Sequence, residues 1–416
     1  MPYLRSLAVL ALAAALAPAA DWPQWLGPNR DCSSSEKVAP WKKDLKADWN
    51  TAVGEGHSSP VVAGGKVYLH TRVGNEDKEV VKAYDIKNGQ EIWAFSYDRG
   101  PFQSQFGLGP RATPTVAGGK VYSFGATGLL YCIDAEKGTE IWHVDTLKKF
   151  KAKNLGFGMS CSPLVEGDLV LVNVGGEGAS VVAFKKDNGE VAWKSGDDKA
   201  SYSSPIALAP LPGKDKERQV VFLTAAGLVS LDPKDGSVFW KVPLVDKLNE
   251  SSTTPVRIGD DLLLASSVTF GSMGVQLETK DGKPSATRLW KNGELTCYFS
   301  TPVPVGKDYV YMVTGTVSLT GASSSTLRCV EAKTGKEKWK KEKVAKYHAA
   351  MLRTADDKLL MLDDGGNLIL IDPDPEKYKE LARSQVCGPT WAHPALSDGR
   401  VFLRDEKELM CVPLGQ

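Results

Sequence analysis

Residues 85–93 read Asp85-Ile86-Lys87-Asn88-Gly89-Gln90-Glu91-Ile92-Trp93, and variants of this phrase return along most of the chain. Each interval holds four short runs of apolar and β-branched residues, and a pair such as Asn-Gly or Lys-Gly separates the last two runs. A fixed period of this kind, with four strands in each repeat, predicts a β-propeller. The closing tryptophan recurs with spacings of 49, 51, 47, 50 and 49 residues, at Trp93, Trp142, Trp193, Trp240, Trp290 and Trp339.

The number of blades follows from the two ends of the repeat region. Residues 348–381 keep the strand pattern without the tryptophan, and residues 391–414 supply only three strands. The missing fourth strand is available at residues 47–50, where Trp49 lies 44 residues before Trp93. We therefore expect an all-β fold: an eight-bladed β-propeller of four-stranded antiparallel blades. Its N-terminal strand closes the last blade and so removes exposed sheet edges.

The N-terminus has the features of a secretory signal. Arg5 precedes an apolar run at residues 7–16 that is too short to span a bilayer, and small residues follow up to Asp21. The predicted organisation is a signal peptide at 1–20, an N-terminal extension at 21–44 and the propeller at 45–416. No cysteine directly follows the apolar run, so a lipid anchor is not expected. The predicted location is secreted or periplasmic, and an uncleaved membrane anchor is the alternative.

Composition limits the partners. Removing residues 1–20 takes away one arginine and no acid, which leaves 51 − 1 = 50 basic against 50 acidic residues. This balance gives no overall attraction to nucleic acid or to anionic membranes, and we expect a monomer. The seven cysteines form no disulfide framework. Three of them, Cys132, Cys329 and Cys411, share one repeat position, which indicates small buried strand residues.

The repeat phrase resembles that of the pyrroloquinoline-quinone (PQQ) β-propeller superfamily. The opening Asp21-Trp-Pro-Gln-Trp-Leu-Gly-Pro-Asn-Arg30 is similar to a secreted bacterial branch of it. The superfamily includes quinoprotein alcohol dehydrogenases and the periplasmic propeller subunit of the outer-membrane barrel assembly machinery. The first group implies PQQ with calcium, and the second implies periplasmic or outer-membrane protein partners. The dehydrogenases also carry an adjacent cysteine pair, which this chain lacks, and none of its carboxylates can be matched to their calcium ligands or catalytic aspartate.

Three functions remain open at this point. The preferred one is a non-catalytic scaffold for protein interaction or binding, without a cofactor. The first alternative is a PQQ-dependent oxidoreductase acting on alcohols or sugars, and the second is a module that binds a sugar or a small anion. The repeat by itself does not choose among them, because one fold hosts several activities.

Candidate site residues come from the ring geometry. The residue three positions before the proline of each innermost strand is expected near the central axis, where loops of the same face converge. Reading around the ring, this position is held by His57, Arg111, Ser160, Tyr202, Ser252, Phe299, His348 and Trp391.

Ring closure makes neighbours of the last two blades and the first two. We therefore predict one ligand-binding arc from His57, Arg111, His348, Trp391 and His393. Arginine suits a carboxylate, so a small anionic ligand is expected there. Two other interpretations stay open: these histidines are hydrogen-bonded between blades, or His57, His348 and His393 hold a metal. We assign no metal ligand.

Overall fold

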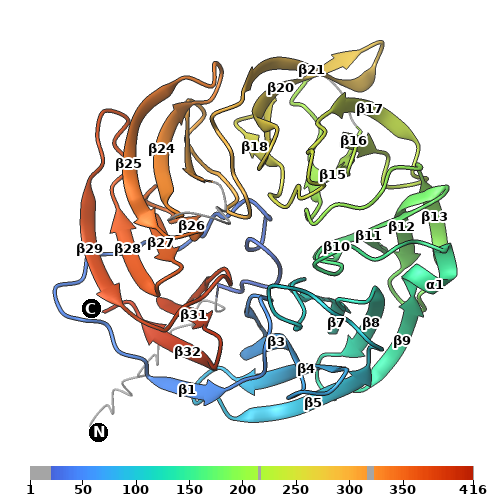
Figure 1. Cartoon of the computed structure of the whole chain (residues 1–416), viewed down its shortest axis with the longest axis horizontal. Coiled ribbons are helices and arrows are strands. Elements are labelled where there is room, and N and C mark those ends of the chain that lie inside the picture. Colours follow the sequence, from blue (N-terminus) through green and yellow to red (C-terminus); the bar gives the residue numbers. More distant parts are fainter. Residues whose placement is uncertain (1–19, 214–216, 316–322, 416) are drawn as a thin grey trace, which may run out of the picture.

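The structure, a computed structural model, describes residues 20–213, 217–315 and 323–415. Within them, eight four-stranded antiparallel sheets surround a central axis (Figure 1), so the predicted eight-bladed all-β propeller is confirmed. A short helix, α1 (Thr146–Phe150), follows the second blade. Nowhere in these ranges does a helix reach the length and hydrophobicity that a membrane span requires. The predicted signal peptide, residues 1–20, lies outside the described residues except for Ala20.

Seven blades are each built from four consecutive strands, ordered from the axis outward. They are blade 1 with β2 (Val61–Ala63), β3 (Lys66–Arg72), β4 (Lys78–Asp85) and β5 (Glu91–Asp98); blade 2 with β6 (Thr115–Ala117), β7 (Lys120–Phe124), β8 (Leu129–Asp134) and β9 (Glu140–Asp145); blade 3 with β10 (Leu164–Glu166), β11 (Leu169–Gly176), β12 (Ala179–Lys185) and β13 (Val191–Ser195); blade 4 with β14 (Ile206–Leu208), β15 (Gln219–Leu223), β16 (Gly227–Leu231) and β17 (Val238–Pro243); blade 5 with β18 (Val256–Ile258), β19 (Leu262–Ser267), β20 (Gly271–Lys280) and β21 (Lys283–Asn292); blade 6 with β22 (Val303–Val305), β23 (Tyr309–Thr314), β24 (Ser325–Glu331) and β25 (Glu337–Ala345); and blade 7 with β26 (Ala349–Arg353), β27 (Leu359–Asp363), β28 (Asn367–Ile371) and β29 (Glu380–Gln385).

The eighth blade joins the two ends of the chain. Its inner strands are β30 (Ala395–Ser397), β31 (Arg400–Arg404) and β32 (Glu408–Pro413), and its outer strand is β1 (Trp49–Ala52). Trp49 lies opposite Cys411 in the antiparallel register. The prediction that the N-terminal strand completes the last blade is therefore confirmed. This pairing closes the ring and covers the edge of β32 that would otherwise be unpaired.

The repeated tryptophan and glycine meet between blades. The ring of Trp93 lies against Gly138 of the next blade, and its Nε1 donates to the carbonyl of Ala135 at 3.1 Å. A Cβ at Gly138 would lie 2.5 Å from this ring, so the contact requires glycine, as does the backbone φ of 66°. The same contact recurs in four other pairs: Trp49 with Gly89, Trp142 with Gly189, Trp193 with Gly236, and Trp290 with Gly335.

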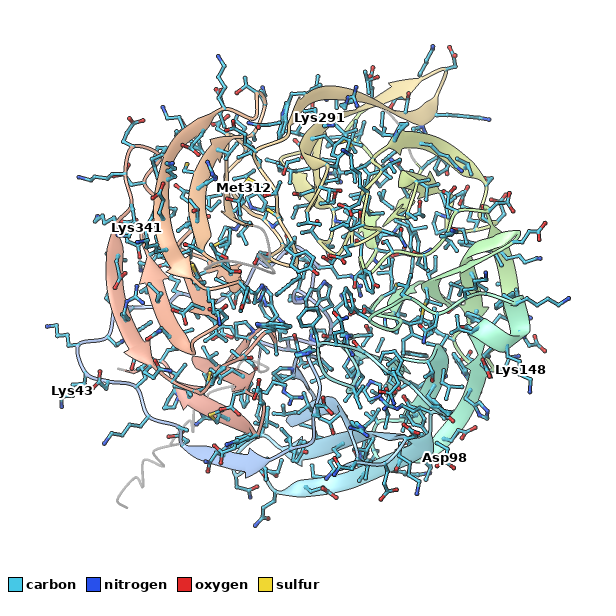
Figure 2. The ribbon with its side chains drawn as sticks, in the orientation of Figure 1. Lys43, Asp98, Lys148, Lys291, Met312 and Lys341 are labelled. Carbon is cyan, nitrogen blue, oxygen red and sulfur yellow. The ribbon has the colours of Figure 1, made fainter. Side chains whose placement is uncertain are left out.

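Blade 5 departs from this pattern. Its β20–β21 hairpin is long, so a Cβ at the turn glycine Gly282 would meet nothing within 4 Å, and the outer strand of the hairpin packs against β17. The Nε1 of Trp240 accordingly bonds the side chain of Gln219, within its own blade, at 2.8 Å. Figure 2 shows side chains filling the space between the sheets, where Met312 is fully buried, while Lys148 and Lys341 point outward at the rim.

Residues 21–41, which we call the N-terminal strap, cross one end of the ring (Figure 1). Two-residue turns between the two innermost strands of the blades lie at this end, which we call the turn face. Asp21 accepts a hydrogen bond from Gly64 in one such turn, and Glu36 accepts hydrogen bonds from Asp398 and Gly399 in another. The opposite end, the loop face, carries the longer loops that lead from one blade to the next.

Candidate functional site

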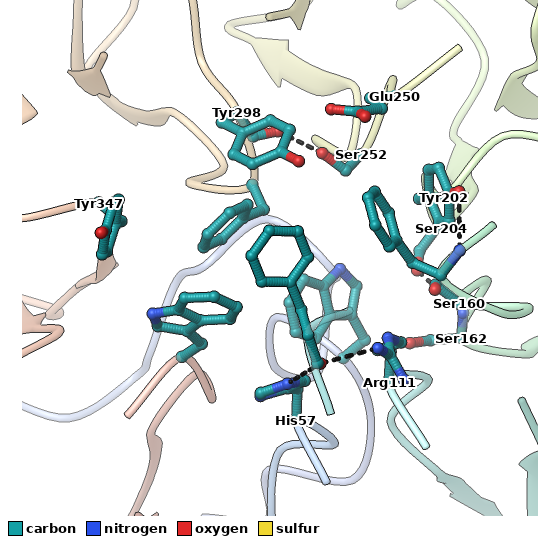
Figure 3. Close-up of a pocket in the computed structure, with 15 residues that line it drawn as sticks. His57, Arg111, Ser160, Ser162, Tyr202, Ser204, Glu250, Ser252, Tyr298 and Tyr347 are labelled. Carbon is teal, nitrogen blue, oxygen red and sulfur yellow. Dashed lines mark hydrogen bonds between the residues drawn. The ribbon is translucent and has the colours of Figure 1, made fainter. Parts of the chain in front are cut away.

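A cavity of about 540 Å³ lies on the propeller axis at the loop face (Figure 3). Of its fifteen lining residues, seven are predicted axial positions. The exception is blade 7, where Tyr347 lines the cavity in place of His348. Blade 7 lacks the proline that sets the register in the other blades, and a shift of one residue along a strand turns a side chain to the opposite face. The predicted axial position in this blade is therefore wrong by one residue.

The wall of the cavity is mostly aromatic. Eight of the fifteen lining residues carry aromatic rings, and several rings touch one another. Phe299 lies 5.2 Å from Trp391 between ring centroids, and Phe157 lies 5.5 Å from Tyr202. The eight are Trp25, Phe106, Phe157, Tyr202, Tyr298, Phe299, Tyr347 and Trp391. Such a lining suits a ligand with an apolar or aromatic body.

The strap supplies the floor of the cavity. The Nε1 of Trp25 donates to the hydroxyl of Thr254 in blade 5 at 2.8 Å. Arg30, which is only 2% exposed, donates to the carbonyls of Ser162, Pro163 and Pro205, each at 2.9 Å. These contacts hold the strap against blades 3, 4 and 5. Because the strap crosses the turn face, the cavity is blind and is entered from the loop face.

His57 and Trp391 form one side of the cavity. Their rings stack with centroids 5.1 Å apart, and the Nε2 of His57 bonds the carbonyl of Phe106 at 3.0 Å. A carbonyl only accepts, so this nitrogen carries the proton. Burial, and then the nearby charge of Arg111, lower the pKa of His57 to about 4. His57 is therefore neutral near pH 7.

Arg111 lines the cavity, but its guanidinium is largely engaged in its own loop. It donates to the carbonyls of Gly109 at 2.6 Å and of Phe106 and Gly107 at 2.9 Å, and to the hydroxyl of Ser104 at 3.1 Å. Burial lowers the pKa of Arg111 to about 10, so it stays charged near pH 7. Through these hydrogen bonds, Arg111 fixes the shape of the loop at residues 104–109. Its role as an anion anchor stays a prediction.

His348 and His393 lie beneath the wall, each 4% exposed. The Nδ1 of His348 bonds the hydroxyl of Ser300 at 2.8 Å, and its ring packs on Phe299. The ring of His393 meets Trp25 edge-on at 5.6 Å. The structure thus brings His57, Arg111 and Trp391 to the cavity surface and leaves the other two candidates behind it. No group of three or more His, Cys, Asp or Glu in the described ranges is placed to hold a metal ion.

A wider depression of about 770 Å³ adjoins the cavity over blades 7, 8 and 1 and shares His57 and Trp391 with it. Three of the carboxylates that line it are already engaged by backbone N–H groups. Glu55 accepts from Leu108, Asp364 from Tyr347, and Asp405 from Gly388, Lys407 and Glu408. These acids therefore fix loops around the mouth of the cavity.

Sequence reasoning missed several lining residues, above all Trp25 and Glu250. Trp25 belongs to the strap, which has no counterpart in the repeat, and Glu250 lies in a loop between blades 4 and 5. Neither occupies a position that the repeat marks, so the period gave no signal for them.

Known proteins share this architecture. The chain matches a family model described as outer membrane protein assembly factor BamB over residues 35–103 and 76–341, so it belongs to this PQQ-repeat family. It is 26% identical to BamB of Burkholderia pseudomallei over 318 residues, which are 72% of this chain and 70% of that protein. It is also 26% identical to the quinoprotein alcohol dehydrogenase PedH of Pseudomonas putida over 174 residues, 40% of this chain and 28% of that one.

Solved structures agree on the fold. Quinohemoprotein alcohol dehydrogenase from Comamonas testosteroni superposes with a TM-score of 0.61 at 16% identity, covering 95% of this chain and 81% of that one. BamB from Moraxella catarrhalis superposes with a TM-score of 0.58 at 15% identity, covering 88% and 97%. The family match begins at residue 35, so most of the strap, including Trp25 and Arg30, lies before it.

Proposed function

We propose that this protein is a secreted or periplasmic, non-catalytic propeller that binds a partner at its loop face. The observation that carries the proposal is the blind aromatic cavity, which the strap closes at the turn face and which opens among the blade-to-blade loops. Proteins named BamB, an outer membrane protein assembly factor, are relatives over most of the chain and support a scaffold role. His57, Arg111 and Trp391 are the predicted side chains that would contact what enters.

The loop face also presents apolar side chains to solvent. Val245 and Leu248, in the loop between blades 4 and 5, are 60% and 61% exposed. Two large apolar residues so close in one loop favour contact with another protein. The exposed apolar residues at the rim, such as Ile92 and Ile141, are instead spread over separate blades.

PQQ with calcium, the alternative cofactor, fits the lining poorly. PQQ is a polycarboxylate, whereas the cavity offers one guanidinium, Arg111, that is engaged in its loop, and one carboxylate, Glu250, that would repel it. In the described residues no cluster of carboxylates or histidines is placed for calcium. We therefore favour the scaffold over the oxidoreductase. Mixing the pure protein with PQQ and calcium should give neither stoichiometric uptake nor dye-linked alcohol oxidation, and uptake would contradict this choice.

Photo-crosslinking in cells tests the partner-binding face. A photoreactive amino acid at Leu248 should give a discrete crosslinked protein, because this exposed side chain belongs to the loop whose Glu250 lines the cavity. The matched control is the same amino acid at Ile141, which is 41% exposed at the rim of blade 2. Crosslinking from Ile141 but not from Leu248 would show that partners bind the rim, and the proposed binding face would be wrong.

A further inference from the structure

The cavity has few charged side chains, and they differ in how free they are to interact with a ligand. His57 is neutral near pH 7. Arg111 donates hydrogen bonds to three loop carbonyls and a hydroxyl. Glu250 is the one carboxylate among the fifteen lining residues. No lysine or arginine of the described ranges lies within ion-pairing distance of it. The cavity therefore holds one carboxylate, Glu250, that forms no ion pair with a described residue, while the charged Arg111 is hydrogen-bonded within its own loop.

Glu250 is held in place from behind. Asp246, which is buried, accepts hydrogen bonds from the backbone N–H groups of Leu248 at 2.9 Å and Glu250 at 3.2 Å. Asp246 is itself fixed by the hydroxyls of Ser267 and Thr269 at 2.7 and 2.8 Å. This network gives the loop a defined shape, so the backbone that carries Glu250 is preorganised.

Aromatic rings surround the same end of the cavity. Burial, and then the neighbouring Glu250 carboxylate, raise the pKa of Tyr298, and its ring centroid lies 4.7 Å from that of Phe299. Figure 3 shows Glu250 beside Tyr298 and Ser252, with Arg111 on the opposite side of the pocket. Ring faces carry partial negative charge and attract cations. One such cation–ring contact already exists at the cavity, because the ammonium of Lys346 lies 4.8 Å from the ring centre of Tyr347, a lining residue.

We propose that the Glu250 end of the cavity is an ammonium subsite, which takes a primary or quaternary amine carried on an apolar body. Glu250 supplies the charge, Tyr298 and Phe299 supply ring faces, and Trp25 forms the floor below. The proposal rests on the proposed function, because it names the chemistry of the group that the blind cavity receives. A free amine and a lysine side chain of a partner protein share this chemistry.

Calorimetric titration with three matched probes tests the subsite. Phenylethylammonium, 2-phenylethanol and 3-phenylpropionate have similar bodies and are positive, neutral and negative. We expect the ammonium probe to bind at least about ten-fold more tightly than the alcohol, a ratio that corresponds to about 1.4 kcal/mol. We expect the carboxylate to bind most weakly. A fourth probe, Nα-acetyl-lysine amide, which keeps the side-chain ammonium, reports whether the subsite also accepts a lysine side chain.

Glu250→Gln should remove the preference for the ammonium probe while the alcohol binds as before. Glu294→Gln is the matched control, because Glu294 lies exposed in the next loop and does not line the cavity. Equal binding of the three probes, tighter binding of the carboxylate, or no binding at all would overturn the subsite. A Leu248 crosslink obtained alongside any of these results would leave the proposed function standing. PQQ uptake would instead contradict the proposed function itself.

Discussion

At Gly236 two constraints fall on one residue. Its φ of 75° is unfavourable for residues with a side chain, and a Cβ there would lie 2.5 Å from the ring of Trp193 in the preceding blade. The tryptophan in turn packs on this glycine and donates to the carbonyl of Pro233 at 2.9 Å. The recurring pair is therefore a contact between blades, and the period in the sequence records where blades meet.

Trp193→Ala should lower the free energy of unfolding by roughly 3–5 kcal/mol, as expected when a buried aromatic side chain is removed. Its ring is 8% exposed and stabilises the junction of blades 3 and 4. Equilibrium urea unfolding measures the change, and Lys194→Ala, at the exposed neighbour, is the control. An unchanged unfolding midpoint in Trp193→Ala would contradict this account of the contact.

Gly236→Ala should destabilise the protein more than Gly119→Ala does. Gly119 has nearly the same φ, 73°, but a Cβ there meets nothing within 4 Å. Both variants carry the backbone strain, on the order of 1–2 kcal/mol, and only Gly236→Ala also displaces a tryptophan. Equal losses in urea unfolding would show that the tryptophan contact adds nothing.

Among the elements, the strap does most to distinguish this propeller from a bare ring of repeats. It bridges sheets that do not touch each other, since Trp22 pairs with Val62 in blade 1 and Ser33 pairs with Arg353 in blade 7. Between these points Arg30 reaches blades 3 and 4. The strap therefore both staples the turn face and turns an open channel into a blind cavity.

Arg30→Ala should loosen the strap, because it removes the hydrogen bonds of this arginine to the carbonyls of Ser162, Pro163 and Pro205, of which that of Pro163 keeps a second donor, the Thr115 hydroxyl. Each hydrogen bond to a charged group contributes about 1.5–3 kcal/mol, so local opening should become at least about ten-fold easier. Hydrogen exchange of residues 20–35 measures this, with Asn29→Ala, at an exposed neighbour, as the control. Unchanged exchange in Arg30→Ala would mean that these hydrogen bonds do not hold the strap.

At the scale of the whole molecule, stability should depend on pH through three histidines in blades 1, 7 and 8, of which His348 and His393 are buried and His57 is partly buried. Burial is the main cause in each case, and it lowers the pKa of His57 and His393 to about 4 and of His348 to about 3, from the ordinary 6.5. Between these values the unfolded chain takes up protons that the folded one does not. Stability is therefore full above pH 6.5 and declines as the pH falls toward about 4.

The melting temperature measured by calorimetry should decrease as the pH is lowered from about 7.5 to about 4.5. The decrease should correspond to a loss of a few kcal/mol in the free energy of unfolding. His348→Gln should flatten this dependence, because the variant removes a buried group that must stay neutral. His143→Gln is the control, because His143 is exposed and pairs with Glu140 at the surface. A flat profile in the unmodified protein would contradict the prediction.

The sequence by itself determined the propeller, its eight blades and the closure by Trp49. These features depend on local period and on the count of strands, and most repeats carry the same tryptophan, glycine and turn pattern. It also placed seven of the eight axial residues, because a strand beginning at a fixed position presents the same side chain to the axis. In blade 7, which lacks the guiding proline, the predicted axial residue His348 is one position away from Tyr347, which lines the cavity.

Only the tertiary structure decided what kind of site the axis holds. The floor comes from Trp25 in a segment without repeat, the one carboxylate comes from a blade-to-blade loop, and the candidate Arg111 is turned to its own loop. These features depend on which segments, distant in sequence, come into contact, and on which polar groups already have hydrogen-bond partners. Neither the period nor the composition encodes these, because both describe neighbours along the chain, whereas the cavity is made by neighbours in space.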